Sequence, residues 1–226
     1  MKFDDIVPWG RSFDEYIRMF SLSDTDLRGA ILGCGDGPAS FNAELTRRGG
    51  NCVSVDPIYA FSRQQIRQRI DDVFTDVMAQ VREERNQFDW RYIGTPERLA
   101  EIRMTAMQIF LEDFDEGRDD DRYLMGALPS LAFEDAKFDL ALCSHVLFLY
   151  SNVLCHQTHI DSIKTLCRVA REARIYPLTD LNGGISPYLG NVIADLSEQG
   201  YKLSLVDVEY RVQKQATQML RISASG

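Results

Sequence analysis

The sequence lacks the long apolar runs of a membrane protein. Its longest apolar stretch, around residues 140–150, is well short of the ~20 residues that a membrane-spanning helix needs. Residues 1–5 also lack the basic and then apolar segment that begins a secretory signal. We therefore expect a protein with no membrane segment and no secretory leader.

Basic charge is also in short supply. The 226 residues include 25 lysines and arginines against 34 aspartates and glutamates, which gives a net charge of −9. This balance disfavours a general electrostatic grip on nucleic acid or on an anionic membrane surface. Apolar residues make up 45% and charged residues 26%, as in ordinary globular proteins. The length allows one large domain or two small ones, and we predict a single domain over 1–226.

Paired cysteines are absent. The five cysteines are an odd number and show no CxxC spacing, so we expect no disulfide framework and a reducing, cytoplasmic location. Cys155, His156 and His159 form the one cluster that suggests a metal. Three ligands within one short segment are a weak pattern for zinc, and we predict no metal site.

Short apolar runs alternate with longer helical patterns along most of the chain. This alternation is typical of a doubly wound α/β fold with a mostly parallel sheet. Strands are expected at 29–32, 52–55, 138–143 and 173–178, and helices at 38–48, 158–171 and 186–200. The closely spaced strands 202–208 and 216–222 are expected to pair antiparallel.

Residues 57–122 interrupt this alternation, because no strand is evident there. Ser62 and Gln65 have the spacing of a capping box, and apolar residues then recur every three or four positions through Val81. Thr95-Pro96 begins a second helix. We predict a helical insertion, with the acidic residues 112–121 forming a solvated turn.

Three alternating glycines follow the first strand. Gly33, Gly35 and Gly37 lie between an apolar run and a helix, where the absent Cβ lets a ligand approach the backbone. Asp56 ends the second strand, 23 residues after Gly33, close to the ~20 expected for an acid that binds ribose hydroxyls. We expect Asp56 beside the glycine loop, since parallel strand ends meet at one sheet edge.

The glycine spacing separates two classes of cofactor. Dinucleotide-binding loops follow G-x-G-x-x-G/A, whereas this loop reads G-x-G-x-G and has proline at position 38. It resembles motif I of class I S-adenosylmethionine-dependent methyltransferases. Three later segments are also similar to segments of that family and follow the family's order: residues 126–140, 166–178 and 202–222. In the first of them the match is mainly Leu131, Phe133, Asp135 and Phe138-Asp139. The resemblance covers about two thirds of the chain and implies a Rossmann-like sheet with an antiparallel C-terminal strand pair.

The resemblance also implies the cofactor, S-adenosylmethionine, and its product, S-adenosylhomocysteine. In this sequence, the glycine loop would line the methionine end, Asp56 the ribose and Leu128 the adenine. The full set of implied cofactor-binding residues is Arg11, Gly33, Cys34, Gly35, Gly37, Pro38, Asp56, Pro57, Ala127, Leu128 and Ser144. The family often has an acid two residues before the first glycine and an aspartate at the adenine, and Ile31 and Ala127 occupy these positions here.

Two residues are candidates for catalysis. His145 follows the fourth expected strand and has a suitable unperturbed pKa for a general base, although orienting a loop or packing on the adenosine is an equally good interpretation. Residues 1–28 are predicted to form a helical lid, in which Tyr16 would reach the reacting end. Arg11 would pair with the methionine carboxylate, because guanidinium matches carboxylate in geometry.

The insertion is rich in arginine and contains no lysine. Residues 57–122 hold ten arginines and fifteen acidic residues, which favours helices joined by ion pairs over a nucleic-acid surface. The cluster of Arg63, Arg67 and Arg69 lies near the expected ligand edge, and we hypothesise that it binds an anionic substrate.

These observations predict a methyltransferase that acts on a small molecule, since the insertion is placed to restrict access. Three alternatives remain open. A protein or RNA methyltransferase shares every cofactor feature, a non-catalytic protein that binds S-adenosylmethionine shares the loop, and a dinucleotide oxidoreductase is disfavoured by Pro38.

Overall fold

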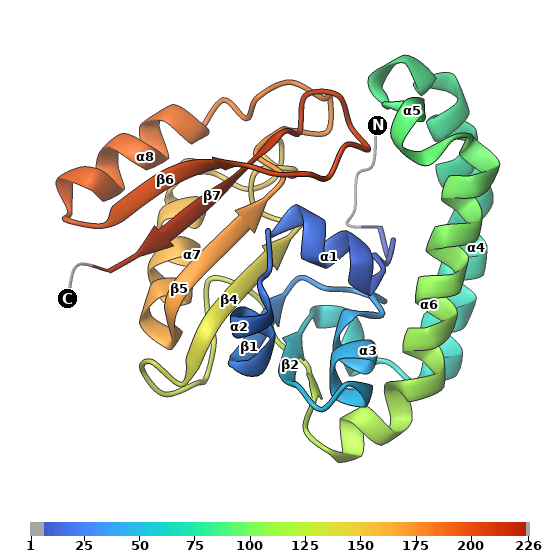
Figure 1. Cartoon of the computed structure of the whole chain (residues 1–226), viewed down its shortest axis with the longest axis horizontal. Coiled ribbons are helices and arrows are strands. Elements are labelled where there is room, and N and C mark those ends of the chain that lie inside the picture. The colour runs from blue at the N-terminus through green and yellow to red at the C-terminus, as the bar shows by residue number, and fades with distance from the viewer. Residues whose placement is uncertain (1–6, 225–226) are drawn as a thin grey trace.

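A seven-stranded sheet forms the centre of the computed structural model, which describes residues 7–224 (Figure 1). The strand order is β3-β2-β1-β4-β5-β7-β6. The first five are parallel, and β7 runs antiparallel to both β5 and β6. The bounds are β1 Ala30–Cys34, β2 Asn51–Val55, β3 Tyr123–Leu124, β4 Phe138–Ser144, β5 Ala170–Tyr176, β6 Lys202–Asp207 and β7 Gln218–Ser223. The predicted α/β fold with its antiparallel C-terminal pair is confirmed.

Helices cover both faces of the sheet. Successive strand residues point to opposite faces, so Ile31 of β1 packs in one apolar cluster and Leu32 in the other. The cluster around Ile31 includes α1 (Phe13–Met19) and α3 (Phe41–Arg47). The cluster around Leu32 includes α7 (His156–Val169) and α8 (Leu189–Glu198). A short helix, α2 (Asp24–Arg28), leads into β1.

The helical insertion projects beyond one end of the sheet, at the right of Figure 1. It comprises the 3₁₀ helices η1 (Pro57–Ala60) and η2 (Arg85–Gln87), and the α-helices α4 (Arg63–Glu83), α5 (Trp90–Ile93) and α6 (Pro96–Asp119). Ser62 forms the predicted capping box, and Thr95 caps α6. The far end is joined to the chain between β6 and β7, because Asp89 N donates to the Val212 carbonyl at 2.8 Å.

Several boundaries differ from the sequence-based predictions. The acidic residues 112–121 do not form a solvated turn, because α6 continues to Asp119 and buries Asp113 against Arg122 and Tyr123. Helix α7 begins at His156, two residues before the expected cap at Thr158. Helix α3 begins at Phe41 and not at Pro38, since the glycine loop extends to Ser40.

The carboxyl ends of the parallel strands are in register. Cys34 lies opposite Val55 on one side and Cys143 on the other, and Val55 lies opposite Leu124. The segments that follow these strands therefore emerge at one edge of the sheet. The strand order reverses between β1 and β4, and ligands usually bind at such a point in parallel sheets. Within residues 7–224, no helix combines the length and apolar character that a membrane span requires.

Candidate functional site

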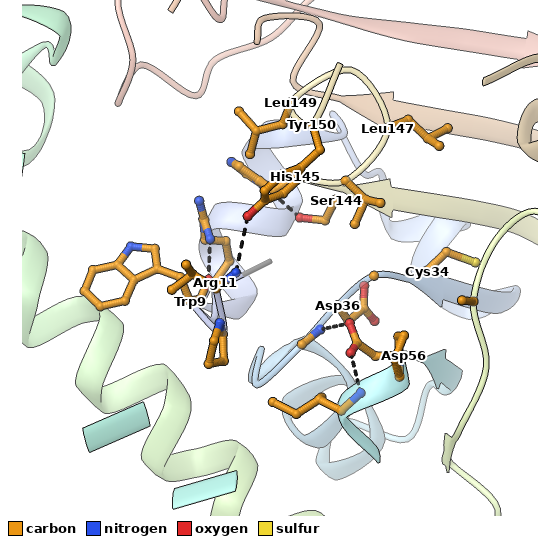
Figure 2. Close-up of a pocket in the computed structure, with 18 of the residues that line it drawn as sticks. Trp9, Arg11, Cys34, Asp36, Asp56, Ser144, His145, Leu147, Leu149 and Tyr150 are labelled. Carbon is orange, nitrogen blue, oxygen red and sulfur yellow. Dashed lines mark hydrogen bonds between the residues drawn. The ribbon is translucent and has the colours of Figure 1, made fainter. Parts of the chain in front are cut away.

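A cavity of about 890 Å³ opens at this edge of the sheet. Its floor comes from the segments after β1, β2 and β4, and its roof from the N-terminal segment, α4, α6 and the chain after β6. Figure 2 shows Asp36 and Asp56 on one side of this space and Trp9 and Arg11 on another. The volume lies near the upper end of the roughly 300–1,000 Å³ typical of small-molecule sites.

The glycine loop exposes bare backbone to the cavity at Gly37. Gly35 and Gly37 have φ of +69° and +52°, a region that side chains disfavour. A Cβ on Gly35 would lie 2.1 Å from Val146, so that glycine is needed for packing. No atom lies within 4 Å of the corresponding position on Gly37, so a ligand can approach the chain there.

Asp56 is fixed beside the loop by two backbone hydrogen bonds. Its Oδ2 accepts from Gly37 N at 2.9 Å and its Oδ1 from Ile58 N at 2.8 Å, as Figure 2 shows. Burial raises its pKa, and the two backbone donors oppose that rise. Each carboxylate oxygen has a second lone pair, so Asp56 can still accept from two hydroxyls of a bound molecule.

Asp36, inside the loop, is a second buried carboxylate. Its Oδ1 accepts from the Tyr16 hydroxyl and its Oδ2 from the Ser54 hydroxyl, both at 2.7 Å. Burial raises its pKa to about 6, although these hydrogen bonds favour the charged form. No cation among residues 7–224 forms an ion pair with it. Sequence analysis missed this residue, and an acid within a glycine loop was the available signal.

Arg11 is a partly buried cation that forms no ion pair with a carboxylate of residues 7–224. Its Nη1 donates to the Trp9 carbonyl, and its Nε has no hydrogen-bond partner. Burial and then repulsion from Arg103 lower its pKa, but a guanidinium stays protonated in proteins. Glu15 attracts it without forming an ion pair, so Arg11 keeps donors that a ligand carboxylate can use.

Arg103 of α6 instead forms an ion-paired group with Glu15 and Tyr210, although its Nε has no hydrogen-bond partner. Its Nη1 pairs with Glu15, and its Nη2 donates to the Tyr210 hydroxyl at 3.1 Å. That hydroxyl donates to Glu15 at 2.6 Å. Burial would raise the Glu15 pKa, but attraction to Arg103 and its hydrogen bond hold that pKa at about 2. The group joins the insertion to α1 and to the chain after β6.

His145 is held in an unusual backbone conformation after β4. Its φ is +56°, its N donates to the Tyr176 carbonyl at 2.7 Å, and its Nδ1 lies 3.0 Å from Ser144 Oγ. Burial, followed by repulsion from Arg11 and Arg103, lowers its pKa well below 6.5. The imidazole is therefore neutral near pH 7 and can accept a hydrogen bond inside the cavity.

Most of the predicted site residues line the cavity. They are Arg11, Cys34, Gly35, Gly37, Asp56, Pro57, Ala127, Leu128, Ser144 and His145. Gly33 does not, because the Asp36 carboxylate covers its Cα, and Pro38 does not, because its carbonyl faces Gly10.

Tyr16 also lies outside the cavity lining, contrary to the prediction that it reaches the reacting end. Its ring is fully buried and stacks on Phe41, with 4.6 Å between ring centroids. Its hydroxyl is used by Asp36. We reinterpret Tyr16 as a residue that positions Asp36.

The remaining predictions concern the metal and the arginine cluster. Residues 7–224 contain no cluster of histidine, cysteine or acidic side chains placed to hold a metal, and the ring nitrogens of His159 lie 2.8 and 3.0 Å from backbone carbonyls. Of the three clustered arginines, Arg63 pairs with Asp115 and Arg67 contacts Gln108, whereas Arg69 lines the cavity.

Comparisons with known proteins found one clear relative. No protein-family model matches the chain. Uncharacterized protein MJ0045 of Methanocaldococcus jannaschii is 31% identical over 219 residues, which cover 96% of each chain.

Solved structures show weaker likenesses. The TehB-like SAM-dependent methyltransferase of Corynebacterium glutamicum gives a TM-score of 0.47 at 14% identity, covering 98% of this chain and 89% of that one. Magnesium protoporphyrin IX methyltransferase of Synechocystis, with SAH bound, gives 0.47 at 13% identity, covering 94% and 82%. The PH0226 protein of Pyrococcus horikoshii gives 0.46 at 11% identity, covering 88% and 82%.

Proposed function

This chain belongs to the same protein family as MJ0045 of M. jannaschii, and we propose that it is a methyltransferase that uses S-adenosylmethionine and methylates a small molecule. The observation that carries the proposal is a pair of groups of opposite charge. Asp36 and Arg11 line one cavity, and neither forms an ion pair within residues 7–224. A zwitterionic amino-acid group supplies both missing charges.

The methionine end of the cofactor fits these two groups. Its ammonium matches Asp36, which retains a free lone pair on each oxygen beyond the Tyr16 and Ser54 contacts. Its carboxylate matches Arg11, whose Nε has no hydrogen-bond partner. In class I methyltransferases an acid at the position of Ile31 often holds the ammonium, and we assign that role here to Asp36.

The nucleoside end fits the neighbouring strand ends. Asp56 presents two partly used oxygens to the ribose hydroxyls, beside the open backbone of Gly37. Pro57 and Ile58 line one side of the adjoining space and Ala127 and Leu128 another. These residues offer apolar packing to adenine.

Bound S-adenosylmethionine would supply an electrophilic methyl group on its positively charged sulfur. The chain contributes mainly position and exclusion of water, which together account for much of such a rate enhancement. His145, neutral and facing the cavity, accepts a hydrogen bond from the incoming acceptor. Because burial and two arginines oppose its protonation, we assign it orientation of the acceptor and not full proton removal.

The roof of the cavity favours a small acceptor. Helices α4 and α6 close over it, and the chain after β6 is joined to the insertion by Asp89 and Val212. A volume of about 890 Å³ accommodates a nucleoside cofactor and a small second molecule. This enclosure disfavours a protein or RNA substrate.

Calorimetry with three ligands tests the proposal. We expect S-adenosylhomocysteine to bind, and 5′-methylthioadenosine, which lacks the amino-acid end, to bind at least tenfold more weakly. Arg11→Gln should reduce this difference, and the part that remains should come from the contact between Asp36 and the ammonium. Binding of NAD without binding of S-adenosylhomocysteine would refute the proposal. Tight binding of the cofactor, with no product from any acceptor mixture, would instead support a non-catalytic binding protein.

A further inference from the structure

Charges of opposite sign line opposite parts of the cavity. The carboxylates of Asp36 and Asp56 lie at the strand ends. The guanidiniums of Arg11, Arg69 and Arg103 come from the N-terminal segment and the insertion. No carboxylate of the described residues lines that second part of the cavity.

A bound cofactor leaves one of these arginines unmatched. Its ammonium matches Asp36, its ribose hydroxyls match Asp56, and its own carboxylate matches Arg11. Glu15 already neutralises Arg103. Arg69 therefore remains as the cavity's uncompensated cation.

The surroundings of Arg69 set it apart from its neighbours on α4. Arg63 forms an ion pair with Asp115 at 3.0 Å, and Arg67 contacts Gln108 at 3.4 Å. Arg69 has no hydrogen bond or ion pair with any part of the chain between residues 7 and 224. It is an exposed residue at the mouth of the cavity, so its side chain is free to receive a ligand.

The part of the cavity wall that lies along α4 beyond Arg69 is mainly apolar. Val77 and Val81 of α4, Leu99 of α6 and Phe88 line it and are almost fully buried. Trp9 adds an aromatic surface from the N-terminal segment. Arg103 and Tyr210 also line the cavity, but both are already bonded to Glu15. The wall therefore favours a mainly apolar ligand body.

We propose that the methyl acceptor is a small apolar molecule with one carboxylate, and that Arg69 binds this carboxylate. This inference rests on the proposed function, since the cofactor is what leaves Arg69 unmatched. Arg69 acts on binding and makes no contact with the reacting atoms. Because it is exposed, solvent screens the pair and its effect is modest, about fivefold in affinity.

A matched pair of probes tests the inference: 4-phenylbutyrate and its uncharged amide. The protein carries Trp90→Phe, so that Trp9 in the cavity reports binding by its fluorescence, and S-adenosylhomocysteine is held at saturation. We expect the acid to bind about fivefold more tightly than the amide. Arg69→Gln should abolish that preference and Arg69→Lys should restore part of it.

Arg67→Gln is the matched control, because it removes an arginine two residues away that does not line the cavity. The preference for the acid should persist in this variant. Equal affinities for acid and amide, a preference that survives Arg69→Gln, or no Trp9 response to either probe would each overturn the inference. Failure of S-adenosylhomocysteine to bind, measured first by calorimetry, would instead overturn the proposed function.

Discussion

The Tyr16 hydroxyl donates a hydrogen bond to Asp36 Oδ1 across 2.7 Å and so joins helix α1 to the glycine loop. Ser144, which lies 3.0 Å from His145 Nδ1, is close enough to Tyr16 to act on the pKa of that hydroxyl. A connected polar chain therefore runs from Asp36 to His145. Its members hold each other in place, so Asp36 is oriented toward the proposed cofactor and His145 toward the proposed acceptor.

Asp36→Asn should weaken binding of S-adenosylhomocysteine about 10- to 100-fold, the value of a hydrogen bond to a charged group. Because the pKa of Asp36 in the wild type is about 6, this binding should also depend on pH. The affinity for S-adenosylhomocysteine should fall as pH drops below 6, about tenfold by pH 5. The reason is that the Asp36 carboxyl must lose its proton before it binds the ammonium. Calorimetry between pH 5 and 8 should show this slope in the wild type and none in Asp36→Asn.

The same substitution should raise stability in the absence of ligand. The folded-state pKa of Asp36, about 6, lies above the ordinary value of 3.8, so the folded state binds more protons between pH 4 and 6. Stability from this group is therefore lost as pH rises through 6. Asp36→Asn removes this penalty, at most about 3 kcal/mol. A melting temperature a few degrees higher at pH 7.5 would agree, and a lower one would contradict it.

The fold was largely predictable because its signals are local. Hydrophobic runs, the capping box at Ser62 and Thr95-Pro96 all correspond to observed elements. Strand β3 was not predictable, since its two residues are defined only by pairing with Ser54 and Val55. The acidic end of α6 was misread for the same reason: Asp113 is stabilised by Arg122, whose position depends on tertiary structure.

The candidate site was likewise predictable only where its signals are local. Spacing placed Gly37 and Asp56 together, and they are hydrogen-bonded at 2.9 Å. The roles of Asp36 and Tyr16 could not be read from the sequence, because α1 must first fold over the loop to bring them into contact. That Arg11 forms no ion pair was likewise not predictable, since the nearby carboxylate of Glu15 is paired with Arg103 in the folded protein.

Gly37→Ala and Gly35→Ala should have separable effects. At Gly37 the positive φ costs about 1 kcal/mol, and the open space leaves the free protein folded. The added methyl would occupy the approach to the backbone, so affinity for S-adenosylhomocysteine should fall at least tenfold. At Gly35 the methyl meets Val146 at 2.1 Å, so thermal denaturation should show a much larger loss of stability. Equal losses of stability in the two variants would refute this distinction.

Asp56→Asn should reduce the ability to distinguish ribose from 2′-deoxyribose. The wild-type carboxylate accepts from sugar hydroxyls, whereas the asparagine side chain keeps one oxygen and gains a donor. We expect S-adenosylhomocysteine to bind the wild type about tenfold better than its 2′-deoxy analogue. Calorimetry on Asp56→Asn should show a much smaller ratio. An unchanged ratio would place the ribose elsewhere.

Glu15→Gln should be the most destabilising of these changes. It leaves the buried guanidinium of Arg103 without its carboxylate, and breaking a buried pair in this way costs about 3–5 kcal/mol. Thermal denaturation should show a fall of roughly 6–20 °C. Glu101→Gln, on the same helix as Arg103, is the control. Glu101 forms only an exposed pair with Arg98, and its loss should cost under about 1 kcal/mol.

The pH dependence of stability gives a second test of the Glu15 pair. The folded-state pKa of Glu15, about 2, lies below the ordinary value of 4.5. Its contribution is therefore complete above pH 4.5 and is lost as pH falls toward 2. Denaturant unfolding between pH 6 and 3 should show a steeper loss in the wild type than in Glu15→Gln, so that the two stabilities converge in acid. Parallel curves would mean that the pair with Arg103 contributes no net stability, and that the insertion is held over the cavity by its apolar contacts and its junction with Val212.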